Sequence, residues 1–515
     1  MTHKRTAKRA GLAVGMIALL ASALPTAAAA APDHGPVAPE WCATVTVPGH
    51  RVDCGTVDRP LVAGKPALGT TEVSYAVVRH SAPGPAKGAV AVNPGGPGEV
   101  AIDRAEVFAH AMAGLLKDHD LLLVDPRGTG RSERIPCGVT DAEYRFGTRA
   151  QQRAAVERCA ENLGPKAAAY TTAATADDID AIRAEIGAPQ LSLYGLSYGT
   201  YLMPVYAARH PERVRSIVLS GAYPHGFDPL VRPSAQAVSL SLRRVCERSA
   251  KAACDGKQAV KDLATTAAGL RARPMTVPIT TDYGTYQVRF TEGKLANLLF
   301  EAASREVGMD PAGRSLLGDL PRALNRFVKG DAAPLRTLIQ EDGATGSEED
   351  QAPYVAVVCN DYRKAWKKDA PRKERWRQYR AALKSAAPGE HGAFSAKGFN
   401  EGPTDGGDVC IGWPRENTPD PQPTKLKLPD VPVLVLSGDL DANTPDANGK
   451  KAAKAFRDSR FFSVRNTGHV PEWEQSGCVT GVATRFLRTG TPGDTSCLRA
   501  LPPIAVAPVR AAAHS

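Results

Sequence analysis

The feature that most constrains the fold is a serine between two glycines in residues 191–202, LSLYGLSYGTYL. Gly195, Ser197 and Gly199 form the pattern G-x-S-x-G, with a strand-like apolar run before it and a helix-like run after it. In that context the pattern forms a tight, strained turn that lifts the serine hydroxyl above a sheet. The small neighbours let the strand and the helix pack closely. The segment therefore predicts a nucleophilic serine at position 197, on an α/β sheet.

Strand-like and helix-like segments alternate on both sides of this turn. We expect strands at residues 71–80, 88–93, 121–125, 190–197, 214–223, 431–441 and 460–466, and helices at residues 175–187, 199–210 and 478–490. Alternation of this kind is typical of an α/β fold with a doubly wound, mostly parallel sheet and right-handed crossovers.

The alternation stops after Tyr223 and resumes near residue 428. The intervening chain is mixed helical, charged and rich in loops, and it is long enough to be a domain. We therefore expect a hydrolase-type core at residues 31–224 and 428–500, and a large, mainly helical lid domain inserted at residues 225–427. The Pro/Ala-rich residues 501–515 are expected to form a flexible tail.

The first 30 residues have the build of a secretory signal peptide. A basic start, MTHKRTAKRAG, leads into an apolar run, then Pro25 and an alanine-rich stretch with an A-x-A type cleavage site near Ala30. The alternative is an uncleaved anchor, because small residues extend the apolar run to about 20, the length that spans a bilayer. The proline and the alanines favour cleavage. We expect a secreted, extracellular protein with no stable membrane association after cleavage.

Charge gives little sign of a nucleic-acid partner. The formal net charge is +10, and four of the basic residues lie in the predicted signal peptide. The one basic cluster, residues 363–380, is typical of a solvated amphipathic helix rather than a nucleic-acid surface. We therefore expect no nucleic-acid binding.

The chain has ten cysteines, and none of them forms a C-x-x-C motif for zinc or redox chemistry. An even number in an exported chain predicts disulfides. The simplest pairing joins neighbours along the chain: Cys42 with Cys54, Cys137 with Cys159, Cys246 with Cys254, Cys359 with Cys410, and Cys478 with Cys497. No metal or cofactor is predicted.

A serine nucleophile needs a base and an orienting acid, which in this fold follow in the order Ser, Asp or Glu, His. The strand that resumes after the lid ends in Asp439 and Asp441. Asp441 is favoured because it lies further past the end of the strand, where sites gather in open α/β sheets, and Asp439 remains the alternative. His469 follows the next strand, in TGHV, and is the expected base.

The loop in residues 89–102, AVAVNPGGPGEVAI, follows an apolar strand and contains three glycines. Such a loop lets backbone N–H groups approach an anion closely. A phosphate site is excluded, because Gly98 is followed by Glu99 rather than Lys-Ser/Thr, and the spacing does not fit G-x-G-x-x-G. We expect an oxyanion hole built from the N–H of Gly96 and the N–H of Tyr198, the residue after the nucleophile.

Four motifs together, NPGGPG, DPRGTGRS, GLSYGTYL and GDLDANTP, resemble those of the secreted bacterial tripeptidyl aminopeptidases, relatives of proline iminopeptidase with a TAP-like C-terminal region. The resemblance extends from about Cys42 to Cys497 and is weakest in the lid. It implies an α/β-hydrolase fold and an exopeptidase with Ser197, Asp441 and His469 as its triad. Carboxylesterases and other hydrolases share the fold, so the fold alone does not identify the substrate.

An aminopeptidase needs a carboxylate for the substrate's cationic N-terminus, and two acids are candidates. Relatives commonly continue PGGPG with Gly-Ser-Gly, whereas this chain has Glu99, which could bind an ammonium group or cap the helix near Ile102. Asp361, in VVCNDYRK, matches a Cys-x-Asp segment of similar lids, although it could equally be a polar neighbour of a disulfide at Cys359.

The favoured function is therefore a secreted serine aminopeptidase acting on peptides. The alternatives are a secreted esterase or lactonase, which would use the same triad on a bulky apolar ester, and a non-catalytic binding module, which the presence of all three triad members disfavours. The sequence carries no signal for an oligomeric state.

Overall fold

The computed structural model of the chain describes residues 38–249, 253–305, 307–344, 351–402, 407–414 and 425–509. The predicted signal peptide at residues 1–30 lies outside them. From Ala38 onward the chain forms one compact unit, so the division into core and lid domains stays a prediction. Among the described residues, no helix has both the length and the hydropathy needed to cross a bilayer.

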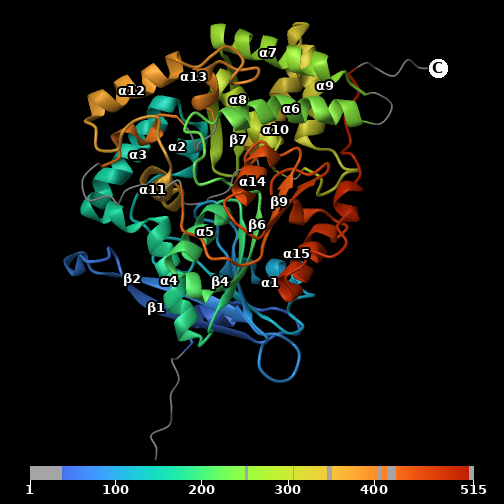
Figure 1. Cartoon of the computed structure of the whole chain (residues 1–515). Helices are drawn as coiled ribbons and strands as arrows, with labels where there is room; N and C mark the ends of the chain where they lie inside the picture. The colour runs from blue at the N-terminus through green and yellow to red at the C-terminus, as the bar shows by residue number, and fades with distance from the viewer. Residues whose placement is uncertain are drawn as a thin grey trace, which may run out of the picture. The chain divides into compact units, whose positions relative to one another are not determined.

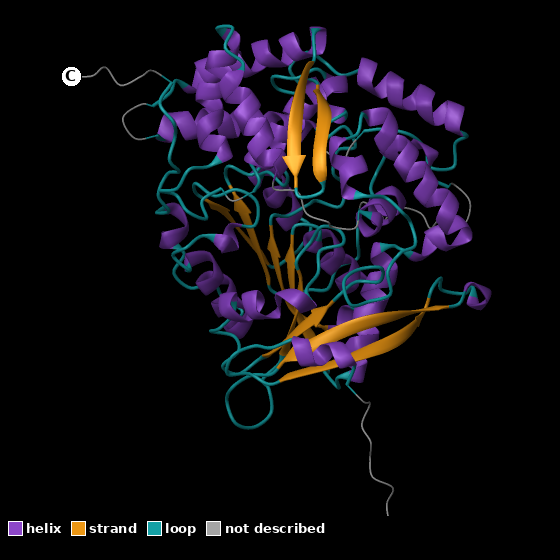
Figure 2. Cartoon of the chain, turned by 180° about the vertical axis from the view of Figure 1, so that it is seen from behind, coloured by secondary structure: helices purple, strands orange, loops and turns teal. Residues whose placement is uncertain are grey.

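Eight strands of the described chain form one sheet, in the order β1-β2-β4-β3-β5-β6-β9-β10 (Figures 1 and 2). The run from β4 to β10 is parallel, and β2 is antiparallel to both of its neighbours. The strands are β1 (Val52–Pro60), β2 (Thr70–Val78), β3 (Ala89–Asn93), β4 (Asp120–Val124), β5 (Leu191–Leu196), β6 (Val214–Ser220), β9 (Val433–Gly438) and β10 (Ser459–Val464). The predicted fold class, a mostly parallel α/β-hydrolase sheet, is confirmed. Only β1, which is half-buried and lacks a long apolar run, was not expected.

Both faces of the sheet are covered because successive strand residues point to opposite sides. In β3, Ala91 packs into the apolar cluster that contains helices α4 (Thr172–Glu185) and α5 (Gly199–Arg209). Its neighbours Val90 and Val92 pack into the opposite cluster, with α1 (Ala105–Ala111) and α15 (Cys478–Thr489). The continuous apolar strands read from the sequence are therefore strands buried on two sides.

One helix starts earlier than expected. The helix predicted to begin at residue 175 begins at Thr172, because Thr171 supplies the N-cap and accepts the N–H of Ala174 at 3.2 Å. The remaining helices between the strands of the core are α2 (Asp141–Phe146), α3 (Arg149–Leu163) and, between β9 and β10, α14 (Asp446–Ala453).

The inserted segment is mainly helical and carries a separate hairpin. Figures 1 and 2 show most of these helices and the hairpin gathered on one side of the large sheet. Its elements are α6 (Arg232–Arg248), α7 (Gly256–Ala272), β7 (Met275–Thr281), β8 (Gly284–Phe290), α8 (Glu292–Ala302), α9 (Leu316–Val328), α10 (Ala333–Ala344), α11 (Ala352–Asp361), α12 (Arg372–Lys384) and α13 (Ala396–Asn400). Helices α6 to α10 share their own apolar cluster with the hairpin, whereas α11 packs into the cluster of α4 and α5.

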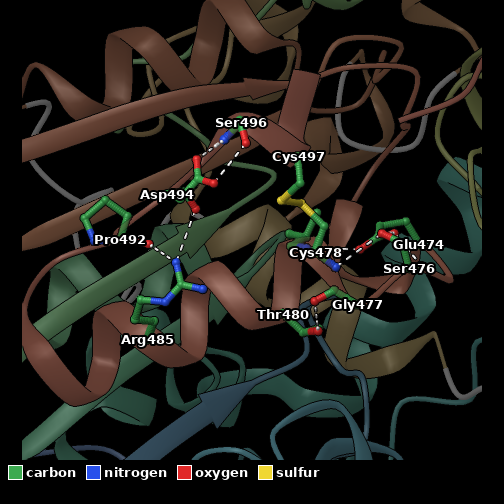
Figure 3. The surroundings of a disulfide bond; sticks show 11 residues. Glu474, Ser476, Gly477, Cys478, Thr480, Arg485, Pro492, Asp494, Ser496 and Cys497 are labelled. Carbon is green, nitrogen blue, oxygen red and sulfur yellow. Dashed lines mark hydrogen bonds between the residues drawn. A yellow bond between two sulfur atoms is a disulfide. The ribbon is translucent and has the colours of Figure 1, made fainter. Parts of the chain in front are cut away.

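All five predicted disulfides are present, and they join the cysteines as neighbouring pairs along the chain. The last of them, Cys478–Cys497, ties the start of α15 to the segment after it (Figure 3). Beside it the Glu474 carboxylate accepts the N–H of Ser476 at 2.7 Å and that of Val479 at 3.0 Å (Figure 3 labels Glu474 and Ser476). These contacts hold the chain shortly after His469.

The expected flexible tail is partly attached. The N–H of Ala505 donates to Pro311 at 2.8 Å, the N–H of Ala507 donates to Gly318 at 3.0 Å, and Ile504 is buried in the cluster of α6 to α10. An apolar residue and backbone hydrogen bonds thus hold residues 504–507 against the inserted segment, and the flexibility of the tail stays a prediction. Residues 510–515 lie outside the described part of the chain.

Candidate active site

Ser197 occupies the turn between β5 and α5 and is only 8% exposed. Its φ of 52° lies in the left-handed region, which a residue with a side chain adopts only at a cost in strain. Its N–H donates to the carbonyl of Ser220 at 2.9 Å, which ties the turn to the end of β6. At Gly195 a Cβ would overlap the carbonyl oxygen of Gly199, so the turn excludes a side chain there. The structure thus has the strained elbow that the G-x-S-x-G pattern predicts.

His469 and Asp441 lie in contact at the same edge of the sheet. Nδ1 of His469 is 2.9 Å from Oδ2 of Asp441, which is only 2% exposed. The other carboxylate oxygen, Oδ1, accepts the N–H groups of Asn443 at 2.7 Å and Thr444 at 3.1 Å. The contact with this carboxylate favours the tautomer in which Nδ1 donates and Nε2 carries the lone pair, and Nδ2 of Asn443 lies 3.5 Å from Nε2.

Sequence reasoning missed two residues beside this pair: Thr444, which bonds to it, and Gly221, which leaves room for the imidazole. The hydroxyl of Thr444 donates to Oδ2 of Asp441 at 2.5 Å and lies 2.9 Å from Nδ1 of His469. At Gly221, just after β6, a Cβ would lie 2.9 Å from the same ring nitrogen. The sequence signals that could have found them are a threonine three residues after Asp441 and a glycine directly after β6.

Asp439, the alternative acid, has other partners. Its Oδ2 is 2.7 Å from Nη2 of Arg248, and its Oδ1 accepts the N–H of Asn466 at 2.8 Å. These contacts fix the ends of β9 and β10 against α6. The structure thus brings Asp441, and not Asp439, to His469.

The glycine-rich loop after β3 passes directly over Ser197. A Cβ on Gly95 would lie 2.8 Å from Cβ of Ser197 and 3.3 Å from its Oγ, so only glycine fits so close to the serine. Gly96 lines the same cavity as Ser197. Tyr198 stands at the start of α5, where backbone N–H groups and the helix dipole favour an anion. The arrangement can stabilise negative charge that develops above Ser197.

Asp361 does not face the cavity, so its predicted contact with a substrate N-terminus is not what the structure shows. The side chain is completely buried at the end of α11, and Oδ2 accepts the N–H of Thr172 at 2.5 Å. The hydroxyl of Thr172 lies 2.9 Å from that of Tyr198. Burial raises the pKa of Asp361 to about 6. The carboxylate is drawn to the start of α4, where helix N–H groups lack partners, and it links α11 to the residue after the nucleophile.

Glu99 lines the cavity and does not cap the next helix. Its carboxylate is 2.8 Å from Nη2 of Arg104, and the side chain is 29% exposed. The N–H groups of Ala101 and Ile102 donate instead to Oδ1 of Asp125, at 2.7 and 3.0 Å. Of the two directions expected for Glu99, the structure has the one that faces the cavity.

Ser197, His469 and Glu99 line one cavity of about 750 Å³, a volume within the range of ligand sites. The inserted segment contributes to its wall through α11 and α8. From α8 comes Glu301, whose Oε2 is 2.7 Å from Nε of Arg305. Sequence reasoning missed this carboxylate because it lies in an ordinary helix of the least recognisable part of the chain.

A further buried acid, Glu472, joins the strand ends to the loop of His469. It accepts a hydrogen bond from the Tyr194 hydroxyl at 2.7 Å and from the Ser220 hydroxyl at 2.5 Å. Burial raises the pKa of this carboxyl. Because the carbonyl of Ser220 also accepts the N–H of Ser197, one set of hydrogen bonds connects the nucleophile turn with the histidine loop.

Comparisons with known proteins agree with this fold. A model of the alpha/beta hydrolase fold matches residues 88–254, and a model described as TAP-like protein matches residues 397–497. The tripeptidyl aminopeptidase of Streptomyces coelicolor is 27% identical over 487 residues, which cover 85% of this chain and 81% of the relative. Carboxylesterase B of Mycobacterium tuberculosis is 27% identical over 497 residues, covering 87% and 86%. Serine protease Hip1 of the same species is 32% identical over 210 residues, covering 38% and 40%. Peptidases and an esterase are thus among the similar proteins.

Proposed function

We propose that this chain, a serine hydrolase of the α/β-hydrolase family with a TAP-like C-terminal region, is a secreted aminopeptidase that releases tripeptides from free N-termini. Similarity to a tripeptidyl aminopeptidase over most of both chains supports the activity. Five disulfides support an oxidising compartment, as does the N-terminal sequence, which has the build of a signal peptide.

In the proposed reaction Oγ of Ser197 attacks the carbonyl carbon of the scissile peptide bond, and Nε2 of His469 takes the hydroxyl proton. Asp441 holds the imidazole in the required tautomer and stabilises the imidazolium. The N–H groups of Gly96 and Tyr198 bind the tetrahedral oxyanion. When the C–N bond breaks, His469 donates the proton to the leaving amine. Water, deprotonated by the same histidine, then hydrolyses the acyl-enzyme and frees the short peptide.

The observation that carries the peptidase assignment is a pair of carboxylates in the wall of the serine cavity. Glu99 and Glu301 both line it, from the glycine-rich loop and from α8 respectively. Both carboxylates pair with an arginine, a carboxylate accepts several donors at once, and an ammonium group supplies three. A cationic N-terminus therefore fits this wall, whereas a neutral ester has no use for it.

The test compares chromogenic tripeptides with free and acetylated N-termini. A hydrogen bond to a charged group contributes about 1.5–3 kcal/mol, so Glu301→Gln should lower kcat/KM for the free peptide roughly 10- to 100-fold. The acetylated peptide should be a poor substrate for both proteins. Glu247→Gln, at an exposed acid of α6 that does not line the cavity, is the control and should behave as wild type. Equal rates on free and acetylated peptides would rule out the aminopeptidase.

A carboxylesterase or lactonase is the second candidate, favoured by the similarity to carboxylesterase B over most of the chain. The same serine, histidine and aspartate would act on an ester carbonyl. If this candidate is right, kcat/KM for aryl esters or lactones should exceed kcat/KM for peptides with a free amine. Activity on peptides with none on such esters would exclude it.

A further inference from the structure

A second cavity, of about 420 Å³, adjoins the one that contains Ser197. The two share four lining residues, Glu99, Glu301, Arg305 and Gln351. The rest of its wall comes from the inserted segment, chiefly α8, α10 and the β7–β8 hairpin, and from α2 and α3. Because the shared residues include both carboxylates of the proposed N-terminus site, these carboxylates stand at the boundary between the cavities.

The hairpin and helices give the second cavity an apolar part. This part consists of Phe146, Ile279, Val288, Phe290, Leu298 and Ile339. Five of the six are buried, at 2–4% exposure, and Phe146 lies in ring contact with Tyr286, at 4.9 Å between centroids. These side chains converge from five elements, α2, β7, β8, α8 and α10, so they form a wall for an apolar group rather than a single exposed patch.

Two polar side chains of the second cavity, Lys294 and Gln152, already bond to the protein backbone. Nζ of Lys294 donates to the carbonyl of Arg145, and the amide of Gln152 donates to the carbonyl of Tyr144 at 2.6 Å. Burial lowers the pKa of Lys294 to about 8 and raises the pKa of Asp342. A ligand with its own charge at this depth would have to displace such contacts, whereas an apolar side chain would not.

We propose that the second cavity is the subsite for the N-terminal residue of the peptide and selects a large apolar side chain. The inference rests on the proposed aminopeptidase function. The ammonium group, the side chain and the rest of the peptide diverge from one carbon atom. With the ammonium at Glu99 and Glu301, the side chain enters the second cavity, while the peptide runs back through the first cavity to Ser197.

The test uses two chromogenic tripeptides that differ only in an N-terminal Phe or Gly. We expect wild type to favour the Phe peptide at least tenfold in kcat/KM. Val288→Phe places a larger side chain in the apolar wall. It should lower the ratio of kcat/KM for the Phe peptide to that for the Gly peptide at least tenfold. Its kcat/KM for the Gly peptide should stay within about twofold of wild type. Gln287→Phe adds the same bulk on the exposed face of β8 and should keep the preference. Because the readout is a ratio of two substrates, it does not depend on the folded fraction.

Hydrolysis of p-nitrophenyl acetate, which is too small to reach the second cavity, reports on folding and on Ser197. If Val288→Phe also loses this activity, Phe146→Ala, at a half-buried position, is used in its place. This variant should weaken the preference for the Phe peptide. Equal turnover of the Phe and Gly peptides by wild type would overturn the subsite while leaving the aminopeptidase intact. Equal rates on free and acetylated peptides would instead overturn the proposed function, and the subsite with it.

Discussion

Replacing Asp361 with asparagine should change how stability depends on pH. The carboxyl is completely buried, and burial raises its pKa to about 6, above the ordinary value near 4. The folded protein therefore holds the proton more tightly than the unfolded chain does. The resulting stabilisation is fully present below about pH 4 and is lost as the pH rises through 6. The difference between the pKa in the folded and in the unfolded chain corresponds to roughly 2–3 kcal/mol of unfolding free energy, lost between pH 4 and pH 7.

Asparagine keeps an acceptor for the Thr172 N–H but does not titrate. The unfolding free energy of Asp361→Asn, minus that of wild type, should therefore rise by roughly 2–3 kcal/mol between pH 4 and pH 7. Any effect of the amide that does not depend on pH cancels in this comparison. Urea unfolding followed by tryptophan fluorescence under non-oxidising, non-reducing conditions measures this difference. Asp369→Asn, at an exposed site on the same segment, is the control and should follow wild type. A difference that does not vary with pH would refute the reasoning.

The same variant separates the structural role of Asp361 from the substrate role expected from the sequence. Because the side chain does not line either cavity at the site, KM for a free-amine tripeptide should change less than twofold. A tenfold rise in KM for the free peptide, with no change for p-nitrophenyl acetate, would mean that Asp361 does contact the substrate.

Two further variants probe contacts near the site. His225 stacks on Tyr201, and both of its ring nitrogens are buried without a hydrogen-bond partner. Burial lowers the pKa of this histidine to about 4. The unfolding free energy of wild type should therefore fall by roughly 3 kcal/mol between pH 6.5 and pH 4. His225→Phe should keep that stability in acid unfolding curves, and parallel curves for the two proteins would contradict this. Thr444→Val removes the hydroxyl that donates to Asp441 and should lower kcat/KM roughly 10- to 100-fold on peptide and ester alike, with little change in Tm. Unchanged kinetics would show that the backbone N–H groups alone hold the carboxylate.

Local patterns were enough to predict most of the sheet and the position of the serine. Strands β3 and β5 are mostly apolar and buried along their whole length, and the serine turn is specified by two glycines whose neighbours leave no room for a side chain. The approach of Asp441 to His469 follows from topology, because the carboxyl ends of adjacent parallel strands β9 and β10 meet at one edge. The disulfides could be predicted because each one joins two consecutive cysteines along the chain.

The residues that the inserted segment contributes to the site could not be predicted from the sequence in the same way. Glu301 and Asp361 are both acids on helices of that segment, and the sequence does not reveal which one faces a cavity. Their directions depend on tertiary contacts: α8 packs among α6 to α10 and the hairpin, whereas α11 packs into the cluster of α4 and α5. The direction of Glu99 depends likewise on Asp125, a residue of another loop that takes the capping position.

The most direct test of the central claim is covalent labelling by a tripeptidyl diphenyl phosphonate, prepared with a free and with an acetylated N-terminus. The phosphonate reacts with a nucleophilic serine whatever step limits turnover. We predict that peptide mapping finds the label on Ser197 and that the free-amine reagent inactivates at least tenfold faster than the acetylated one. Labelling at another residue, or equal rates for the two reagents, would contradict the account.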